Sequence, residues 1–330
     1  MKKFTAVVLS IVLLLSLFCA CSTDSKVPEQ TGTEAAAAAP GEKKVSVVCS
    51  IFPQYDFCRE IAGDKIELEL LLKSKVDLHN YKPGADDILK IKNCDLFINI
   101  GGESDEWADD VLETLGSEKP EVLSLIDTVE AKEEKEIEGA EKEEHEHEEG
   151  EEDEKELDEH VWTSLNNAQS IVSAIADKLC EIDKANADEY TANASEYLKK
   201  LSSLEAQYAE ELGKAKRKTL VFADRFPFRY LADDYSLECF AAFAGCSAET
   251  QASFETIAFL AGKVKEKELP FVLVIDGSDG SVAETVASQS GAEIKTLNSC
   301  QSVSQEEIDN GKTYLSIMEE NLFVLKEVLN

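Results

Sequence analysis

Short apolar runs alternate with helical stretches in the first third of the chain. Buried strands are predicted at residues 45–51, 66–72, 95–100 and 121–125, which are rich in apolar and β-branched side chains. Helices are predicted between them at residues 53–62, 86–92 and 106–115, the first opened by Pro53. Strands that alternate with helices in this way indicate an α/β lobe with a parallel sheet flanked by helices, over residues 43–127.

A second region of alternation follows residue 218. Strands are predicted at residues 219–223, 239–243, 271–275 and 294–297. Helices are predicted at residues 227–235, 254–267, 282–290 and 305–328. The pattern repeats that of the first lobe, and it indicates a second α/β lobe with a parallel sheet over residues 218–330.

Two amphipathic helices are predicted between the lobes, in a connection that covers residues 160–217. Residues 164–184 and residues 186–213 carry apolar side chains at steps of three and four. The second helix is on the order of 40 Å long at 1.5 Å per residue, which is enough to brace two lobes. A coiled-coil dimer seam of about four heptads is the alternative. We expect a monomer whose ligand lies in the cleft between the lobes, at the carboxyl ends of their strands.

The first 42 residues lack this periodicity. Residues 1–20 carry a lysine pair and an apolar segment shorter than the roughly 20 residues of a membrane span, which predicts an export signal. The signal ends in a stretch that resembles a bacterial lipoprotein cleavage box, with Cys21 as the acylated residue. Residues 21–42 are rich in Thr, Ala, Pro and Gly and predict a flexible stalk. We expect an extracytoplasmic protein, lipid-anchored to the outer face of the cell membrane, with an uncleaved anchor helix as the alternative.

Acidic residues dominate the chain and gather in one segment. The formal net charge is −34, and residues 130–159 hold 18 acidic residues against four lysines, a local balance of −14. Residues 128–159 have no apolar period, so we predict a disordered acidic loop that contains two histidines. Such a charge argues against nucleic acid as a partner, because phosphate binding needs clustered Lys and Arg. It attracts cations, although solubility also explains much of it.

Cysteines are numerous after the signal region. They are Cys49, Cys58, Cys94, Cys180, Cys239, Cys246 and Cys300. The odd number leaves at least one thiol unpaired in an exported protein, or joined to another chain. No Cys-x-x-Cys pair occurs in the sequence, so a zinc ribbon or a thioredoxin-type site is unsupported. We expect most of them to be small buried hydrophobic residues, while a disulfide such as Cys239–Cys246 stays open.

Histidine is scarce, and its positions are informative. The four histidines are His79 after the second strand, His145 and His147 inside the acidic loop, and His160 at the end of that loop. Imidazoles at two structured positions, with two more on an acidic loop, suit a transition-metal site with an accessory collecting arm. The alternative is that His160 only caps the next element and that His145 and His147 are solvated surface residues.

Four segments, in the order of the chain, are similar to a known family. Residues 77–86 resemble a loop in which a His precedes a Tyr-x-Pro-x-x-x-Asp pattern, and residues 158–162 resemble an Asp-Pro-His-x-Trp segment. The helix at residues 186–204 and the stretch at residues 314–321 are the other two matches. The mature chain thus resembles, over nearly its whole length, the substrate-binding lipoproteins of bacterial ABC importers for zinc and manganese. The acidic insert with histidines is similar to the loop of zinc-type members.

The resemblance implies metal ligands position by position. His79 and His160 match the first two ligands of the family. The slot of a further histidine falls at Arg225, whose guanidinium only donates hydrogen bonds and cannot replace an imidazole. Donors to complete the site are therefore sought at Asp224, Glu249 and Asn298, with Asp276 and Cys300 as further candidates.

The donor types bear on the metal. Zn²⁺ takes about four N, O or S donors, which two imidazoles and one or two carboxylates satisfy. More oxygen donors would favour Mn²⁺ instead. The resemblance thus implies capture of a divalent metal, Zn²⁺ before Mn²⁺, and its delivery to the membrane subunits of an ABC permease.

Other classes of function fit the sequence less well. We do not expect an enzyme, since no His-Glu-x-x-His helix occurs and no general base stands beside paired ligands. A surface adhesin would also suit the lipid anchor and the stalk. A cobalamin or siderophore binder shares the two-lobe plan, but it does not need the collinear histidines.

Overall fold

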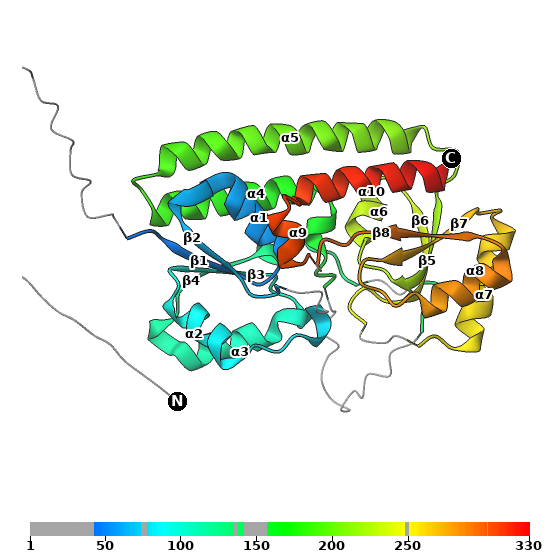
Figure 1. The fold of residues 1–330 in the computed structure, drawn as a ribbon, viewed down its shortest axis with the longest axis horizontal. Helices are drawn as coiled ribbons and strands as arrows, with labels where there is room; N and C mark the ends of the chain where they lie inside the picture. The colour runs from blue at the N-terminus through cyan, green and yellow to red at the C-terminus, as the bar shows by residue number, and fades with distance from the viewer. Residues whose placement is uncertain (1–42, 74–77, 135–136, 142–156, 248–250, 302) are drawn as a thin grey trace, which may run out of the picture. The chain divides into compact units, whose positions relative to one another are not determined.

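Two parallel sheets of four strands each lie at the centres of two lobes in the described part of the chain (Figure 1). The computed structural model describes residues 43–73, 78–134, 137–141, 157–247, 251–301 and 303–330. Residues 43–330 cluster as one compact unit. The predicted architecture of two α/β lobes is thereby confirmed, and the four short gaps and one long gap lie outside the strands of both sheets.

The N-terminal lobe is built on β1 (Ser46–Cys49), β2 (Glu67–Leu70), β3 (Leu96–Asn99) and β4 (Glu121–Ser124), in the order β2-β1-β3-β4. Its helices are α1 (Phe52–Ala62), α2 (Ala85–Asn93) and α3 (Glu106–Leu115). The central strands β1 and β3 pair in parallel and are almost fully buried, because apolar residues cover both faces of the sheet. The carboxyl ends of β2 and β3, where the following loops begin, therefore lie at the same edge of the sheet.

The C-terminal lobe repeats this strand order. It contains β5 (Thr219–Arg225), β6 (Glu238–Phe243), β7 (Phe271–Ile275) and β8 (Glu293–Leu297), in the order β6-β5-β7-β8. The helices are α6 (Arg229–Asp234), α7 (Phe254–Glu266), α8 (Ser281–Ser290), α9 (Gln305–Asp309) and α10 (Tyr314–Leu329). The single helix predicted over residues 305–328 is wrong. It is divided at Gly311, whose φ of 87° ends α9 in the left-handed region.

Two long helices connect the lobes, as predicted. Helix α4 (Leu165–Ile182) begins at Ser164, whose hydroxyl accepts the Asn167 amide at 3.1 Å, and α5 (Ala187–Gly213) runs antiparallel to it (Figure 1). Helix α5 is hydrogen-bonded to both lobes. Its Asn193 amide donates to the Ile61 carbonyl at 2.9 Å, and its Tyr208 hydroxyl donates to the Met318 carbonyl at 2.6 Å.

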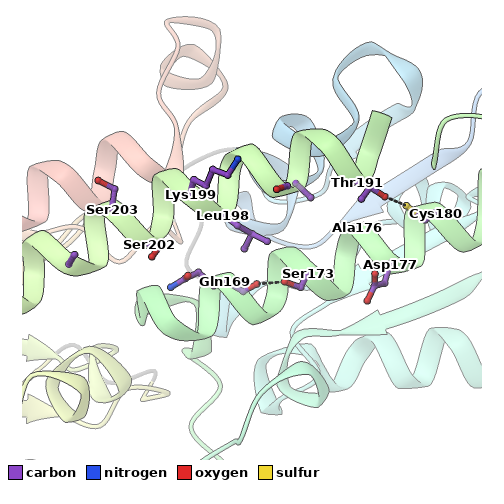
Figure 2. Close-up of a pocket in the computed structure, with 13 residues that line it drawn as sticks. Gln169, Ser173, Ala176, Asp177, Cys180, Thr191, Leu198, Lys199, Ser202 and Ser203 are labelled. Carbon is purple, nitrogen blue, oxygen red and sulfur yellow. Dashed lines mark hydrogen bonds between the residues drawn. The ribbon is translucent and has the colours of Figure 1, made fainter. Parts of the chain in front are cut away.

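A groove follows the α4–α5 pair (Figure 2). Its volume is about 830 Å³, and its lining consists of mostly small residues from these two helices. Gln169, Ser173, Cys180 and Thr191 contribute polar atoms, and the Cys180 sulfur lies 3.6 Å from the Thr191 hydroxyl. None of the predicted metal ligands lines this groove.

The described ends of the acidic segment lie on the C-terminal lobe instead of extending away from it. Glu133 and Leu157 form an isolated antiparallel bridge. The Lys132 amide donates to the Tyr230 hydroxyl at 3.0 Å, and the Glu141 amide donates to the Ala242 carbonyl of the edge strand β6 at 2.9 Å. Residues 142–156, which include His145 and His147, lie outside the described residues.

The seven cysteines of the described residues are free thiols, so Cys239 and Cys246 are not joined. Four of the seven are fully or almost fully buried, as expected for small hydrophobic side chains. In the described part of the chain, no helix has both the length and the apolar character that a membrane crossing requires. Cys21 and the predicted export signal and stalk lie outside the described residues.

Candidate metal centre

His79 is placed by a short turn after β2. It lies in the 3₁₀ turn η2 (Leu78–Asn80), where Leu78 is buried in the core and anchors the turn. The next segment is fixed by Asp87, whose carboxylate accepts the Tyr81 hydroxyl and the Gly84 amide, both at 3.0 Å. The His79 side chain is 5% exposed. The loop thus holds the imidazole inward, next to the carboxyl ends of the strands.

His160 is placed by a second turn, η6 (Val161–Thr163), and is fully buried. The turn is tied to the C-terminal part of the chain by Trp162. The Trp162 indole donates to the Ser299 carbonyl at 2.8 Å, and the Trp162 carbonyl accepts the Tyr314 hydroxyl at 2.6 Å. The Asp158 carboxylate lies 3.1 Å from His160 Nδ1 and accepts the His160 amide at 2.9 Å. A bond from Nδ1 to a carboxylate orients the ring and leaves Nε2 to bind a metal.

The two imidazoles meet, and a carboxylate joins them. The ring centroids of His79 and His160 are 5.4 Å apart. One ligand atom each from His79, Glu159 and His160 lies within 4.8 Å of the other two. Donors about 2.0–2.2 Å from a zinc ion lie about 3.4 Å from one another in a tetrahedral site. Small side-chain shifts therefore suffice for the three residues to share one ion.

Glu159 is held by the loop after β3. This loop contains the 3₁₀ turn η3 (Glu103–Asp105). The Ser104 amide donates to Glu159 Oε2 at 3.0 Å, and the Ser104 hydroxyl donates to Glu159 Oε1. Gly102 packs directly against the glutamate, so closely that a Cβ at this position would lie 2.6 Å from Glu159 Cβ. Glycine is therefore required beside the fully buried Glu159 side chain.

Glu159 was not among the ligands expected from the sequence. It belongs to a run of acidic residues, in which a single carboxylate does not stand out. A signal was nevertheless present, because the segment resembles an Asp-Pro-His-x-Trp pattern and Glu159 stands at the proline position. A departure from a familiar pattern next to a ligand is thus a useful indication of an altered site.

The two histidines have opposite pKa shifts. Burial, aided by the charges of His160 and Arg225, lowers the pKa of His79 to about 2. Burial also acts to lower the pKa of His160, but the bond to Asp158 and the charges of Asp158 and Glu159 outweigh it, so this pKa is raised above 6.5. His79 is therefore neutral and ready to coordinate, whereas His160 binds a proton more tightly than a free imidazole.

The donor set fits a zinc-sized cation. His160 Nε2 is buried and has no hydrogen-bond partner among the described residues. A buried nitrogen without a partner is costly unless a ligand satisfies it. A metal cation would satisfy this nitrogen, and the nearby carboxylate of Glu159 would supply negative charge to balance the cation.

Two of the other predicted donors, Asp224 and Asn298, use their side-chain oxygens for hydrogen bonds elsewhere. The two oxygens of Asp224 accept the Arg225 amide at 2.8 Å and the Ile275 amide at 3.2 Å, so this carboxylate links β5 to β7. The Asn298 side chain accepts the Cys300 amide at 2.8 Å. Burial raises the pKa of the Cys300 thiol, which opposes formation of a thiolate ligand.

Two further candidate ligands were Asp276 and Glu249. The Asp276 carboxylate accepts the Ser299 hydroxyl at 2.9 Å. Glu249 lies outside the described residues. The structure therefore brings together His79 and His160, adds Glu159, and gives Asp224 and Asn298 hydrogen-bonding roles in the C-terminal lobe.

Known proteins are similar to this chain in sequence. The chain is 32% identical over 302 residues to the high-affinity zinc uptake system protein ZnuA of Bacillus subtilis. This alignment covers 91% of this chain and 92% of that relative. It is 30% identical over 285 residues to the zinc-binding lipoprotein AdcA of Streptococcus pneumoniae, a match that covers 86% of this chain. That match covers 56% of AdcA, so the chain spans about half the length of this relative.

Solved structures agree with these matches. The Zn(II)-bound ZnuA-like domain of Streptococcus pneumoniae AdcA has a TM-score of 0.71 at 28% identity, covering 87% of this chain and 99% of that domain. The laminin-binding protein Lmb of Streptococcus agalactiae, described as having adhesin and metal transporting activity, has a TM-score of 0.73 at 25% identity, covering 87% of this chain and 100% of that one.

A family model gives the same result over most of the chain. The model described as zinc-uptake complex component A, periplasmic, matches residues 47–328. This range contains both lobes, the long connecting helices and all three residues of the metal cluster. The chain therefore belongs to the family of periplasmic A components of zinc-uptake complexes.

Proposed function

We propose that this protein binds one Zn²⁺ ion outside the cytoplasmic membrane and delivers it to the membrane subunits of an ABC permease. The observation that carries this proposal is the buried cluster of His79, Glu159 and His160, whose ligand atoms lie within 4.8 Å of one another. The zinc-binding names of the relatives support the same cargo. The cluster serves binding and release, and we propose no catalytic role for it.

The donor types favour zinc over manganese. Two imidazole nitrogens and one carboxylate oxygen make a donor set that zinc accepts in tetrahedral sites, whereas manganese prefers a larger number of oxygen donors. Glu249 stays a proposed fourth donor, and water is the other source of a fourth ligand. His145 and His147 stay proposed as accessory residues that bind the metal weakly on its way to the cluster.

The location follows from the start of the sequence. We propose that Cys21 carries the lipid and that residues 21–42 act as a stalk, so the lobes lie at the outer face of the membrane. The AdcA relatives from Streptococcus pneumoniae are named lipoproteins, which supports this placement. A monomer is sufficient for the proposed function, because all three cluster residues come from one chain.

Calorimetry of the metal-free protein tests the proposal. Zinc should bind with one ion per chain, and manganese should bind more weakly at the same site. Anomalous scattering from zinc-loaded crystals should then place the ion between His79, Glu159 and His160. Absence of stoichiometric zinc binding, or an ion located elsewhere in the lobes, would contradict the proposed function.

The pH dependence of zinc affinity should follow one histidine. The pKa of His79 is lowered to about 2, so this ring does not exchange a proton near neutral pH. The pKa of His160 is raised above 6.5, so this ring must lose a proton before it binds zinc. We expect affinity to fall about tenfold per pH unit below the pKa of His160, the slope of a single proton. Titrations between about pH 7.5 and about pH 5.5 measure this slope.

A matched control separates His160 from another buried acid. Burial raises the pKa of Asp105 to about 7, so its carboxyl titrates in the same range. Asp105→Asn should leave the slope of one proton intact. A slope of two protons in the parent protein, or no slope, would contradict the assignment.

The same two pKa shifts make opposite contributions to the pH dependence of the stability of the metal-free protein. His79 takes up a proton only on unfolding, so its contribution to stability falls as the pH drops below 6.5. His160 holds its proton more tightly in the folded state. Its contribution to stability is therefore present below pH 6.5 and is lost as the pH rises through the raised pKa.

A further inference from the structure

We infer that Ser104 is a positioning residue for the metal centre. Its hydroxyl donates its one hydrogen to Glu159 and accepts the hydrogen of His79 Nδ1, so that His79 presents an unprotonated Nε2 to the metal. This inference rests on the proposed zinc site, and it assigns a role to a residue that no sequence motif indicated.

The contacts of Ser104 join the two ligands. Its oxygen lies 2.6 Å from His79 Nδ1 and also contacts Glu159 Oε1, while its amide donates to Glu159 Oε2 at 3.0 Å. His79 Nδ1 and Glu159 Oε1 are themselves 3.4 Å apart. One half-buried serine thus touches two ligands that come from segments 80 residues apart in the sequence.

Hydrogen counting then fixes the direction of each bond. A serine hydroxyl has one hydrogen to donate, and an ionised carboxylate can only accept. The hydrogen of Ser104 therefore goes to Glu159, and the short contact to His79 needs its hydrogen on Nδ1. A neutral imidazole carries one N–H, so Nε2 keeps its lone pair. Asp158 sets the ring of His160 in the same orientation through Nδ1 at 3.1 Å.

The loop around Ser104 is fixed without its hydroxyl. Asp105 is buried, and its carboxylate accepts the Ile100 amide and the Ser50 hydroxyl, the latter at 3.4 Å. Glu159 would also keep the Ser104 amide bond in an alanine variant. Ser104→Ala therefore removes the hydroxyl alone, and the loop stays in place.

Zinc affinity and histidine NMR test the inference together. Ser104→Ala should weaken zinc binding by about tenfold to about 100-fold, the usual effect of removing a group that orients a metal ligand. Ser104→Thr keeps a hydroxyl and should restore most of the affinity. Ser124→Ala is the matched control, because it removes a half-buried hydroxyl that bonds to Asn99 at 2.8 Å in the same lobe, with no contact to a ligand.

The tautomer gives a readout that a purely structural role would not change. The chain has four histidines, so long-range ¹H–¹⁵N spectra of histidine-labelled, metal-free protein can be assigned by His→Ala variants. His79 should carry its hydrogen on Nδ1 in the parent protein and should lose this preference in Ser104→Ala, while the variant still unfolds in one cooperative transition. Hydrogen on Nε2 in the parent protein, or equal zinc affinity in Ser104→Ala, would overturn the inference. Failure of the parent protein to bind zinc would instead refute the proposed function, while the spectra would still decide the tautomer.

Discussion

Replacing His79 and His160 together with alanine is expected to abolish stoichiometric zinc binding. These imidazoles supply two of the three ligands that lie within 4.8 Å of one another. A binding free energy of about 12 kcal/mol shared by about four donors corresponds to about 3 kcal/mol per donor. Loss of two donors therefore costs about 6 kcal/mol, or about four orders of magnitude in affinity. Isothermal titration calorimetry on metal-free protein measures the loss.

The remaining two histidines provide the matched control. His145→Ala combined with His147→Ala removes the same number of imidazoles from the acidic segment. This variant should retain one tightly bound zinc ion, because the buried cluster is intact. A melting curve should accompany each titration, since His160 is fully buried and its removal leaves a cavity. Equal zinc affinity in the His79 and His160 double variant and in the parent protein would refute the assignment of the site.

Replacing Glu159 with glutamine should weaken zinc binding by about 100-fold, the effect of losing about 3 kcal/mol from one donor. The substitution keeps the size of the side chain and removes its charge, so the two imidazoles stay in place. The melting temperature of the metal-free variant should stay close to that of the parent protein, because removal of a fully buried charge offsets the loss of one hydrogen bond from Ser104, which the NH2 group of glutamine cannot accept. Calorimetry and thermal melts on the same samples measure both effects.

The neighbouring Glu106 gives a control for charge alone. It lies on α3 close in sequence to Ser104, its side chain is exposed, and it is not part of the metal cluster. Glu106→Gln removes one negative charge near the site and should change zinc affinity less than about threefold, as expected for a screened surface charge. If both variants bound zinc as tightly as the parent protein, Glu159 would have no role as a ligand.

The two-lobe fold could be predicted from local pattern. Apolar runs marked the strands, and the stepped apolar positions of residues 186–213 marked α5, whose seven buried residues include Tyr190, Leu201 and Tyr208. The break between α9 and α10 was missed because residues 305–328 carry helix-forming side chains on both sides of it. Gly311 interrupts them with a positive φ, an effect that one glycine in a long helical pattern does not reveal by itself.

The candidate metal site was predictable only where a residue type was rare. His79 and His160 stood out because the chain has four histidines. Glu159 and Ser104 belong to abundant types, and their contacts join positions 25 and 55 residues apart. No local pattern encodes such contacts, since they arise when the loops after β2 and β3 end at one edge of the lobe. Asp224 and Asn298 were attractive as donors by type, but backbone amides of their own lobe already occupy their oxygens.

Tyr314 joins three distant parts of the protein. Its amide donates to the Asp56 carboxylate at 2.6 Å, and its hydroxyl donates to the Trp162 carbonyl at 2.6 Å. Its ring packs edge-on against Phe57, with the ring centroids 4.8 Å apart. The turn that carries His160 is thus held in part by α10. A displacement of the C-terminal helix would therefore reach a member of the candidate cluster, although that helix contributes no residue to the cluster itself.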